Sequence, residues 1–173
     1  VKGKSRFKNS QMILDLWIRH SEWPMLHIVH NGENNKNGFL EIKQPILIKD
    51  NITLYQYELN ETTLESLMNR CGNHICPSET EGFGHYINEA RSVGAVIITT
   101  NAAPMNEFTS KNYGFLINVV ESKKIGLGFF YKLSDIELET EIQKCINTSW
   151  EQKSIQGEIG KQLYNENCIC FDN

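Results

Sequence analysis

The sequence predicts an α/β domain of the doubly wound kind, in which helices cover both faces of a mostly parallel sheet. Short runs rich in β-branched residues recur along the chain, and stretches with helical periodicity separate them. The clearest example is a buried run at 74–76, a helical stretch at 84–93 and a second buried run at 96–100. Because two neighbouring strands joined by a helix run parallel, this order of elements predicts a parallel sheet.

Composition places the chain among ordinary soluble proteins. It has 173 residues, of which 40% are hydrophobic and 22% charged, and its net charge is −4. These values suit one globular domain, so we expect residues 1–173 to form a single unit. The mild negative charge argues against a nucleic-acid partner, and no apolar run is long enough to span a membrane. Since the sequence shows no secretory signal, we expect a cytoplasmic location.

The first part of the chain alternates helix and strand, as the α/β class requires. After a basic turn, Asn9 or Ser10 caps a helix that extends to about residue 20 with apolar side chains on one face. Strands are expected at 25–30, 46–48 and 52–55, and a polar turn at 31–37.

Two capping boxes predict helix starts further along. Thr62 with Glu65 begins one helix, and Ser134 with Glu137 begins another. The side chains expected to point inward are Leu64, Leu67, Met68 and Cys71 in the first helix and Leu138, Ile142, Cys145 and Ile146 in the second.

The chain is expected to end in a strand and two helices. The last clear strand lies at 113–119, ahead of the helix that begins near Ser134. A final helix is predicted at 151–165, although Gly157 and Gly160 lower its helix propensity.

The turn within 77–90 is the candidate binding site, because ligands of open α/β sheets lie beyond the carboxyl ends of the strands. Gly82 and Gly84 let the backbone approach a ligand closely or take a positive φ. The helix that follows offers N–H groups and the positive end of its dipole to an anion. Glu81 and Glu89 are separated by roughly 12 Å at most, which is too far to act on one atom. The two carboxylates are well placed to hold the two ends of an extended ligand.

The spacing of these glutamates resembles the E-x7-E motif of glycosyltransferases with the GT-B fold. The resemblance is closest to their retaining "group 1" family, family 4, in which Gly-Phe-Gly follows the first Glu and Ala follows the second. It implies that Glu81, Gly82, Phe83 and Gly84 hold the donor sugar and that Glu89 holds the ribose.

The same resemblance assigns roles outside the turn. Family members bind the donor diphosphate with two cations, which correspond here to Lys4, where Arg is usual, and Lys8. Because Lys lacks the bidentate fork of Arg, its grip on phosphate is expected to differ. The resemblance places Tyr57 beside the base and Asn106 near the donor sugar and phosphate, and it makes Glu81 and Lys8 the catalytic residues.

The implied reaction is transfer of a sugar from a UDP- or GDP-sugar to a glycan, lipid or protein acceptor, with retention at the anomeric carbon. The resemblance implies no metal and no other cofactor, and the five cysteines match no zinc-binding spacing. It covers the Rossmann-like, C-terminal half of a GT-B enzyme. We therefore expect a fragment of a longer enzyme whose N-terminal domain binds the acceptor and could lie at a membrane surface, and we expect the fragment alone to be inactive.

Three alternatives stay open at this point. The chain could be a nucleotide-binding module without transferase activity, or a sugar-nucleotide epimerase of the same GT-B shape. Gly3-Lys4-Ser5 also matches the end of a P-loop, although a helix should then begin at once and the helical pattern starts only near Asn9.

Overall fold

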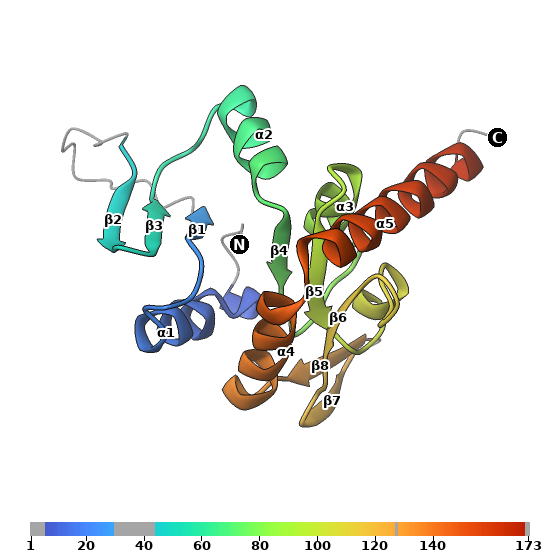
Figure 1. Ribbon diagram of the computed structural model, residues 1–173. Coiled ribbons are helices and arrows are strands. Elements are labelled where there is room, and N and C mark those ends of the chain that lie inside the picture. The colour runs from blue at the N-terminus through green and yellow to red at the C-terminus, as the bar shows by residue number, and fades with distance from the viewer. Residues whose placement is uncertain (1–5, 30–43, 127, 172–173) are drawn as a thin grey trace.

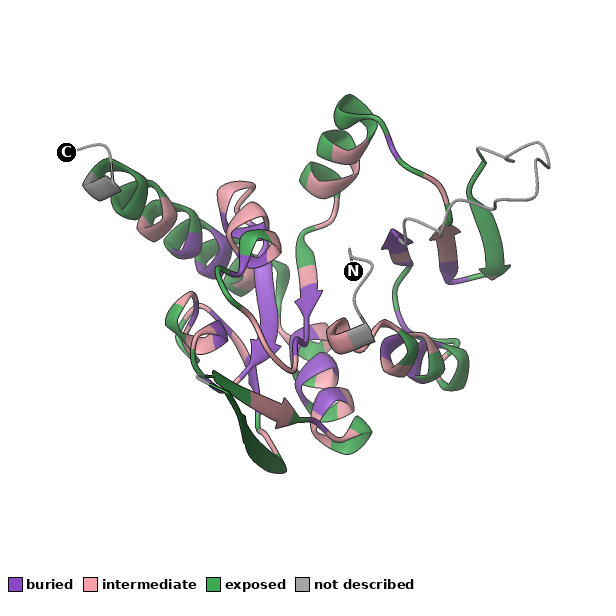
Figure 2. Ribbon diagram, turned by 180° about the vertical axis from the view of Figure 1, so that it is seen from behind, coloured by how far each residue is buried: buried purple, intermediate pink, exposed green. Residues whose placement is uncertain are grey.

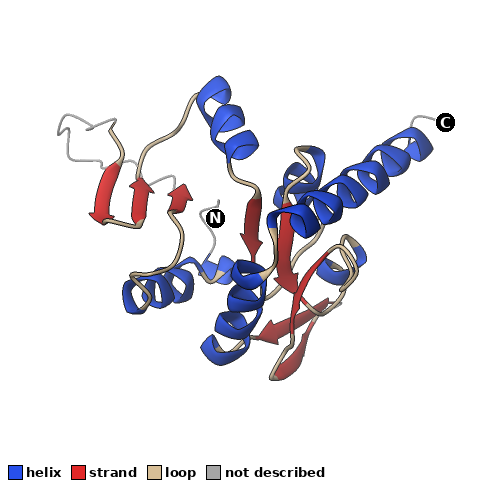
Figure 3. Ribbon diagram, in the orientation of Figure 1, coloured by secondary structure: helices blue, strands red, loops and turns tan. Residues whose placement is uncertain are grey.

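The computed structural model describes residues 6–29, 44–126 and 128–171 of the chain (Figures 1 and 3). Its helices are α1 (Ser10–Arg19), α2 (Glu61–Arg70), α3 (His85–Ser92), α4 (Asp135–Asn147) and α5 (Trp150–Phe171), with 3-10 turns η1 (Arg6–Lys8) and η2 (Met105–Glu107). Its strands are β1 (Leu26–Val29), β2 (Ile46–Lys49), β3 (Ile52–Tyr55), β4 (Asn73–Cys76), β5 (Val96–Thr100), β6 (Gly114–Ile117), β7 (Glu121–Ile125) and β8 (Gly128–Lys132).

The strands confirm the predicted α/β class with a parallel sheet. β4, β5 and β6 pair in parallel in that order, and β1 pairs in parallel with β3. β2 is antiparallel to β3, because a tight turn joins the two. Within the described residues these strands form two three-stranded groups, with β1 at the edge of one and β4 at the edge of the other.

The main core lies where helices cover these strands. Every residue of β5 is buried, as Figure 2 shows. Ile13 and Leu16 of α1 and Leu138 and Ile142 of α4 belong to the same apolar cluster as Ile98 of β5. The cap predicted for α4 is confirmed, since the Ser134 hydroxyl accepts the Glu137 N–H at 3.2 Å. The hydrophobic period of α1 and α4 therefore predicted their packing correctly.

The prediction for α2 was wrong in two respects. The helix is capped by Asn60, whose side chain accepts the Thr63 N–H at 2.8 Å, so Thr62 lies inside the first turn instead of capping it. No residue of α2 is buried. The apolar residues of its inner face are only half-buried because they line an open cavity instead of meeting the main core; they are Leu64, Leu67, Met68 and Cys71.

A β-hairpin formed by β7 and β8 follows the strand that was expected to be the last. Its first strand is fully exposed, so it lacks the alternation of buried and exposed residues that identifies a strand. Gly126 has a φ of 60° at the tip, a conformation that favours glycine. At its base, the Tyr131 N–H donates to the Glu79 carbonyl at 2.8 Å, which attaches the hairpin to the turn after β4.

The last helix is longer than predicted and continues through both glycines. α5 packs against α3 and β5, and Gly157 lies at the point of closest approach. A Cβ atom there would lie 2.1 Å from the carbonyl oxygen of Gly94. Packing of α5 on the turn before β5 therefore requires a residue without a side chain at this position.

We predict that Gly157→Ala destabilises the protein although Ala favours helices. The gain in helix propensity is about 1 kcal/mol, but overpacking against a backbone carbonyl costs about 1–3 kcal/mol. Gly160→Ala is the matched control, because the nearest atom to its Cβ, on the Tyr113 ring, would be 3.9 Å away. Urea denaturation should show a lower midpoint for Gly157→Ala and an unchanged or higher one for Gly160→Ala. Equal midpoints for the two variants would contradict the packing argument.

Candidate functional site

The end of β4 and the turn that follows it are each held by a hydroxyl group of β5, that of Thr99 for the strand and that of Thr100 for the turn. Thr99 donates to the Cys76 carbonyl at 2.8 Å and Thr100 donates to the Ser78 carbonyl at 2.6 Å, and all three polar residues of these bonds (Ser78, Thr99 and Thr100) are buried. Gly84 takes a φ of 65° just before α3, and a Cβ there would meet the Phe108 ring at 2.8 Å. The path of the backbone through the turn is thus fixed at both ends.

Lys8 of η1 forms an ion pair with Glu81 of this turn. The two side chains are largely enclosed, with 17% and 12% of their surface exposed. Glu81 also accepts a hydrogen bond from the Ser78 hydroxyl at 2.7 Å. Two bonds hold η1 and the residue after it against the turn: Glu79 N–H donates to the Phe7 carbonyl at 2.9 Å, and the Asn9 amide donates to the Pro77 carbonyl at 2.9 Å. The structure therefore brings together the two residues predicted to be catalytic.

The glycine-rich part of the turn lies open beside this ion pair. Gly82 is exposed, and a Cβ on it would have no neighbour within 4 Å. Phe83 is 58% exposed and its ring lies 4.8 Å from that of His85. Gly84 is buried and begins α3 without a side-chain cap. A ligand could therefore approach the backbone of the turn next to Lys8 and Glu81.

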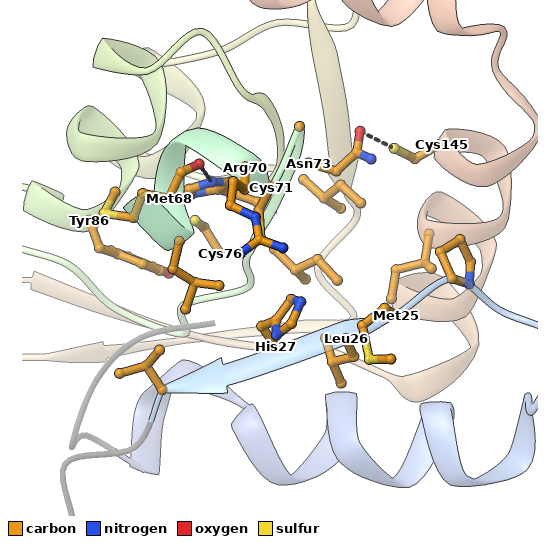
Figure 4. Close-up of a pocket in the computed structure, with 18 of the residues that line it drawn as sticks. Met25, Leu26, His27, Met68, Arg70, Cys71, Asn73, Cys76, Tyr86 and Cys145 are labelled. Carbon is orange, nitrogen blue, oxygen red and sulfur yellow. Dashed lines mark hydrogen bonds between the residues drawn. The ribbon is translucent and has the colours of Figure 1, made fainter. Parts of the chain in front are cut away.

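A cavity of about 370 Å³ lies behind the turn, between the edge strands β1 and β4 and under the inner face of α2 (Figure 4). Most of its lining is apolar. Glu89 and Tyr86 of α3 line the cavity from one side, and His27, Arg70 and His74 add polar groups. Burial lowers the pKa of His74 to about 4, and burial followed by the charge of Arg70 lowers the pKa of His27. Both imidazoles are therefore neutral at neutral pH.

Asn106 and Tyr57 make their described side-chain contacts with residues other than the ion pair. Asn106 of η2 donates to the Asn101 side chain at 3.3 Å, and Tyr57 is half-buried with its ring 6.3 Å from that of Tyr55. Among the described residues, neither Asn106 nor Tyr57 contacts Lys8 or Glu81 through a hydrogen bond or ring contact. Lys4 lies outside the described residues.

Sequence reasoning missed two residues of this site. Ser78 and Tyr86 both contact the charged pair, Ser78 through its hydroxyl and Tyr86 through its ring. A signal for Ser78 was present, because it lies two residues after a strand that ends at the site. Tyr86 could not be recognised in this way, since an aromatic residue in the first turn of an amphipathic helix usually belongs to the core.

The described parts of the chain contain no group of three or more His, Cys, Asp or Glu side chains that could hold a metal ion. They also contain no helix long and apolar enough to cross a membrane.

The fold and the turn, taken with a family comparison, define a glycosyltransferase-type domain. Residues 10–144 match the family described as glycosyl transferases group 1, and this range includes both Glu81 and Glu89. The match covers more than half of the chain, so the chain belongs to this family. No curated protein matches the chain in sequence.

Solved structures with the same fold include several larger proteins. The Anabaena protein HepE, in complex with UDP and glucose, has a TM-score of 0.67 at 15% identity, and the chain covers 42% of it. WaaG, a glycosyltransferase involved in lipopolysaccharide biosynthesis, has a TM-score of 0.63 at 14% identity, with 41% covered. The GtfA/B complex has a TM-score of 0.63 at 18% identity, with 31% covered. These matches cover 95%, 94% and 92% of the present chain, which thus spans less than half of each neighbour.

We predict that the ion pair stabilises the folded protein. Lys8→Met should cost about 1–3 kcal/mol of unfolding free energy, because it leaves a largely enclosed carboxylate without its cation. In a Glu81→Gln background the same change should cost clearly less. Lys132→Met is the control, since Lys132 and Glu121 form an exposed pair, 4.0 Å apart, whose loss should cost less than about 1 kcal/mol. Chemical denaturation measures all four variants, and equal costs for the two lysines would contradict this account of the site.

Proposed function

We propose that the chain is the donor-binding domain of a retaining glycosyltransferase of family 4, the C-terminal half of a GT-B enzyme, and that its donor is a UDP- or GDP-sugar. One observation carries the proposal. Lys8 of η1 forms an ion pair with Glu81, the first glutamate of the E-x7-E motif. This pair lies beside the open glycine turn and the start of α3. A diphosphate and a sugar need these groups side by side: a cation and helix amides for the phosphates, and a carboxylate for hydroxyl groups.

The proposed mechanism assigns a separate contact to each part of the donor. Lys8 binds the diphosphate and stabilises the negative charge that develops on it as the sugar leaves. Glu81 accepts hydrogen bonds from sugar hydroxyls, and the backbone of Gly82, Phe83 and Gly84 supports the sugar and phosphates. Glu89, which is eight residues further along and lines the cavity, binds the ribose. No metal is required, because the lysine and the helix amides supply the positive potential.

Three further contacts complete the proposed donor site. Lys4 is a second cation for the diphosphate, Tyr57 lies beside the base, and Asn106 contacts the sugar or phosphate. The Asn106 amide donates to the Asn101 side chain at 3.3 Å, which orients it within the loop after β5. These assignments rest on the positions that match the family motif.

The whole activity is proposed for a longer protein. Since the chain spans 31–42% of its structural neighbours, we propose that residues 1–173 are one domain of a two-domain, cytoplasmic enzyme. The other domain binds the glycan, lipid or protein acceptor and closes the cleft against water. Holding donor and acceptor together supplies several kcal/mol of the barrier, roughly 7–11 for well-oriented reactants. The 173-residue chain alone should therefore transfer no sugar.

The two motif glutamates should be separable by the ligands they bind. Glu89→Gln should weaken UDP or GDP and the matching sugar nucleotide equally, by roughly tenfold, because a hydrogen bond to a charged group is worth about 1.5–3 kcal/mol. Glu81→Gln should weaken the sugar nucleotide and leave the free nucleotide unchanged. Calorimetric titration of the full-length protein measures both ligands, and Glu158→Gln on the exposed face of α5 is the control. If both variants weaken both ligands to the same extent, the assignment of the glutamates is wrong.

Lys8 should act on the diphosphate through its charge. Lys8→Ala should reduce affinity for UDP or GDP by roughly tenfold while affinity for uridine or guanosine stays unchanged. The difference should shrink as salt rises, because the Debye length falls from about 10 Å at 0.1 M to about 3 Å at 1 M. Lys132→Ala, in the exposed hairpin, should have no effect. Normal diphosphate binding by Lys8→Ala at low salt would exclude a phosphate-binding role for this turn.

A further inference from the structure

We infer that Ser78 and Tyr86 are positioning residues that hold the Glu81 carboxylate for the donor sugar and so determine how strongly the site prefers a sugar nucleotide over the free nucleotide. The inference rests on the proposed function and adds two residues to it. Ser78 belongs to the turn and Tyr86 lines the cavity, and neither needs to contact the donor itself.

The position of Ser78 is fixed independently of its side-chain contacts. Ser78 is fully buried two residues after β4, and its carbonyl accepts the Thr100 hydroxyl at 2.6 Å. Its own hydroxyl lies within hydrogen-bond distance of two oxygens, Glu81 Oε1 at 2.7 Å and the Tyr86 hydroxyl. Since a carboxylate only accepts, Ser78 donates its one hydroxyl proton to Glu81. Tyr86 must then donate to Ser78.

The result is an oriented chain of hydrogen bonds from Tyr86 through Ser78 to Glu81. Burial raises the pKa of Tyr86 well above its usual value, so its hydroxyl keeps the proton that it donates. The tyrosine ring has a second contact, because the Lys8 ammonium lies 3.7 Å from its centroid, the distance of a cation–π interaction. Tyr86 therefore contacts Lys8 directly and reaches Glu81 through Ser78.

The described hydrogen bonds of the Glu81 carboxylate are made by one of its two oxygens. Lys8 and Ser78 both bond to Oε1 of Glu81, and no described residue donates a hydrogen bond to Oε2. When a diphosphate draws Lys8 away, the Ser78 bond stays and keeps the carboxylate from rotating. Oε2 then faces the sugar in the orientation that the Ser78 bond gives it. Because Glu81 is already ordered, binding the sugar costs no further side-chain entropy at this residue.

The test compares sugar nucleotides with free nucleotides as ligands of the full-length protein. Ser78→Ala and Tyr86→Phe are titrated with UDP-glucose and GDP-mannose and with free UDP and GDP. Each variant should bind the sugar nucleotide roughly three- to tenfold more weakly and bind the free nucleotide within about twofold of the wild type, as expected for the loss of one hydrogen bond. Tyr86→Phe keeps the ring under Lys8 and the packing of α3, so it remains informative even where Ser78→Ala folds poorly. In a Glu81→Gln background, neither Ser78→Ala nor Tyr86→Phe should further reduce the preference for the sugar nucleotide over the free nucleotide.

A matched control separates positioning from stability. Thr99→Val removes a hydroxyl hydrogen bond that is equally buried and lies next to the turn, but it does not reach Glu81. It should lower the melting temperature and leave the preference for the sugar nucleotide unchanged. The inference is overturned if Glu81→Gln abolishes that preference while Ser78→Ala and Tyr86→Phe retain it, or if Thr99→Val changes it as much as they do. A wild-type protein that binds no sugar nucleotide would overturn the proposed function, and the inference with it.

Discussion

The ion pair between Lys8 and Glu81 is the contact on which the site depends, and it joins segments that are 73 residues apart. An ion pair between two side chains with several rotatable bonds does not by itself fix the positions of two chain segments, so other bonds must hold the segments together. The backbone bond from Glu79 to Phe7 and the amide bond from Asn9 to Pro77 do this. Asn9 takes a φ of 52° just before α1, which lets the chain leave η1 and enter the helix. The charges meet because the backbone places them together.

The parts of the fold that depend on local sequence were predictable. β5 is a run of β-branched residues that is buried throughout, and α3 begins and ends within one residue of the predicted range 84–93. Gly84 takes the positive φ that a glycine before a helix suggests. The assignment of Lys8 and Glu81 to one catalytic site came from the family resemblance and not from periodicity, because no local pattern relates residues so far apart in the chain.

The features that sequence could not predict are those created by distant contacts. The hairpin β7–β8 has no buried face along its first strand. Its second strand nevertheless attaches to the turn through Tyr131 and to η1 through Phe130, whose ring lies 5.2 Å from that of Phe7. The helix α2 has the apolar period of a packed helix, yet its inner face meets a cavity. The spacing of apolar residues indicates which face of a helix is apolar, but it does not determine how completely other parts of the protein cover that face.

The ion pair keeps the charges of Lys8 and Glu81 largely enclosed, which is the environment that a bound donor would also give them. Lys8 and Glu81 are mostly withdrawn from water and neutralise each other, with Ser78 and Tyr86 completing their contacts. A donor that offers a diphosphate to Lys8 and hydroxyl groups to Glu81 replaces one set of partners with another, so little new desolvation of protein charge accompanies binding. A free diphosphate satisfies only the lysine and offers no donor-sugar hydroxyl groups to the carboxylate. Discrimination between the two ligands then comes from the hydrogen bonds that the sugar hydroxyls donate to Glu81, so the residues that orient its carboxylate matter for the sugar and not for the nucleotide.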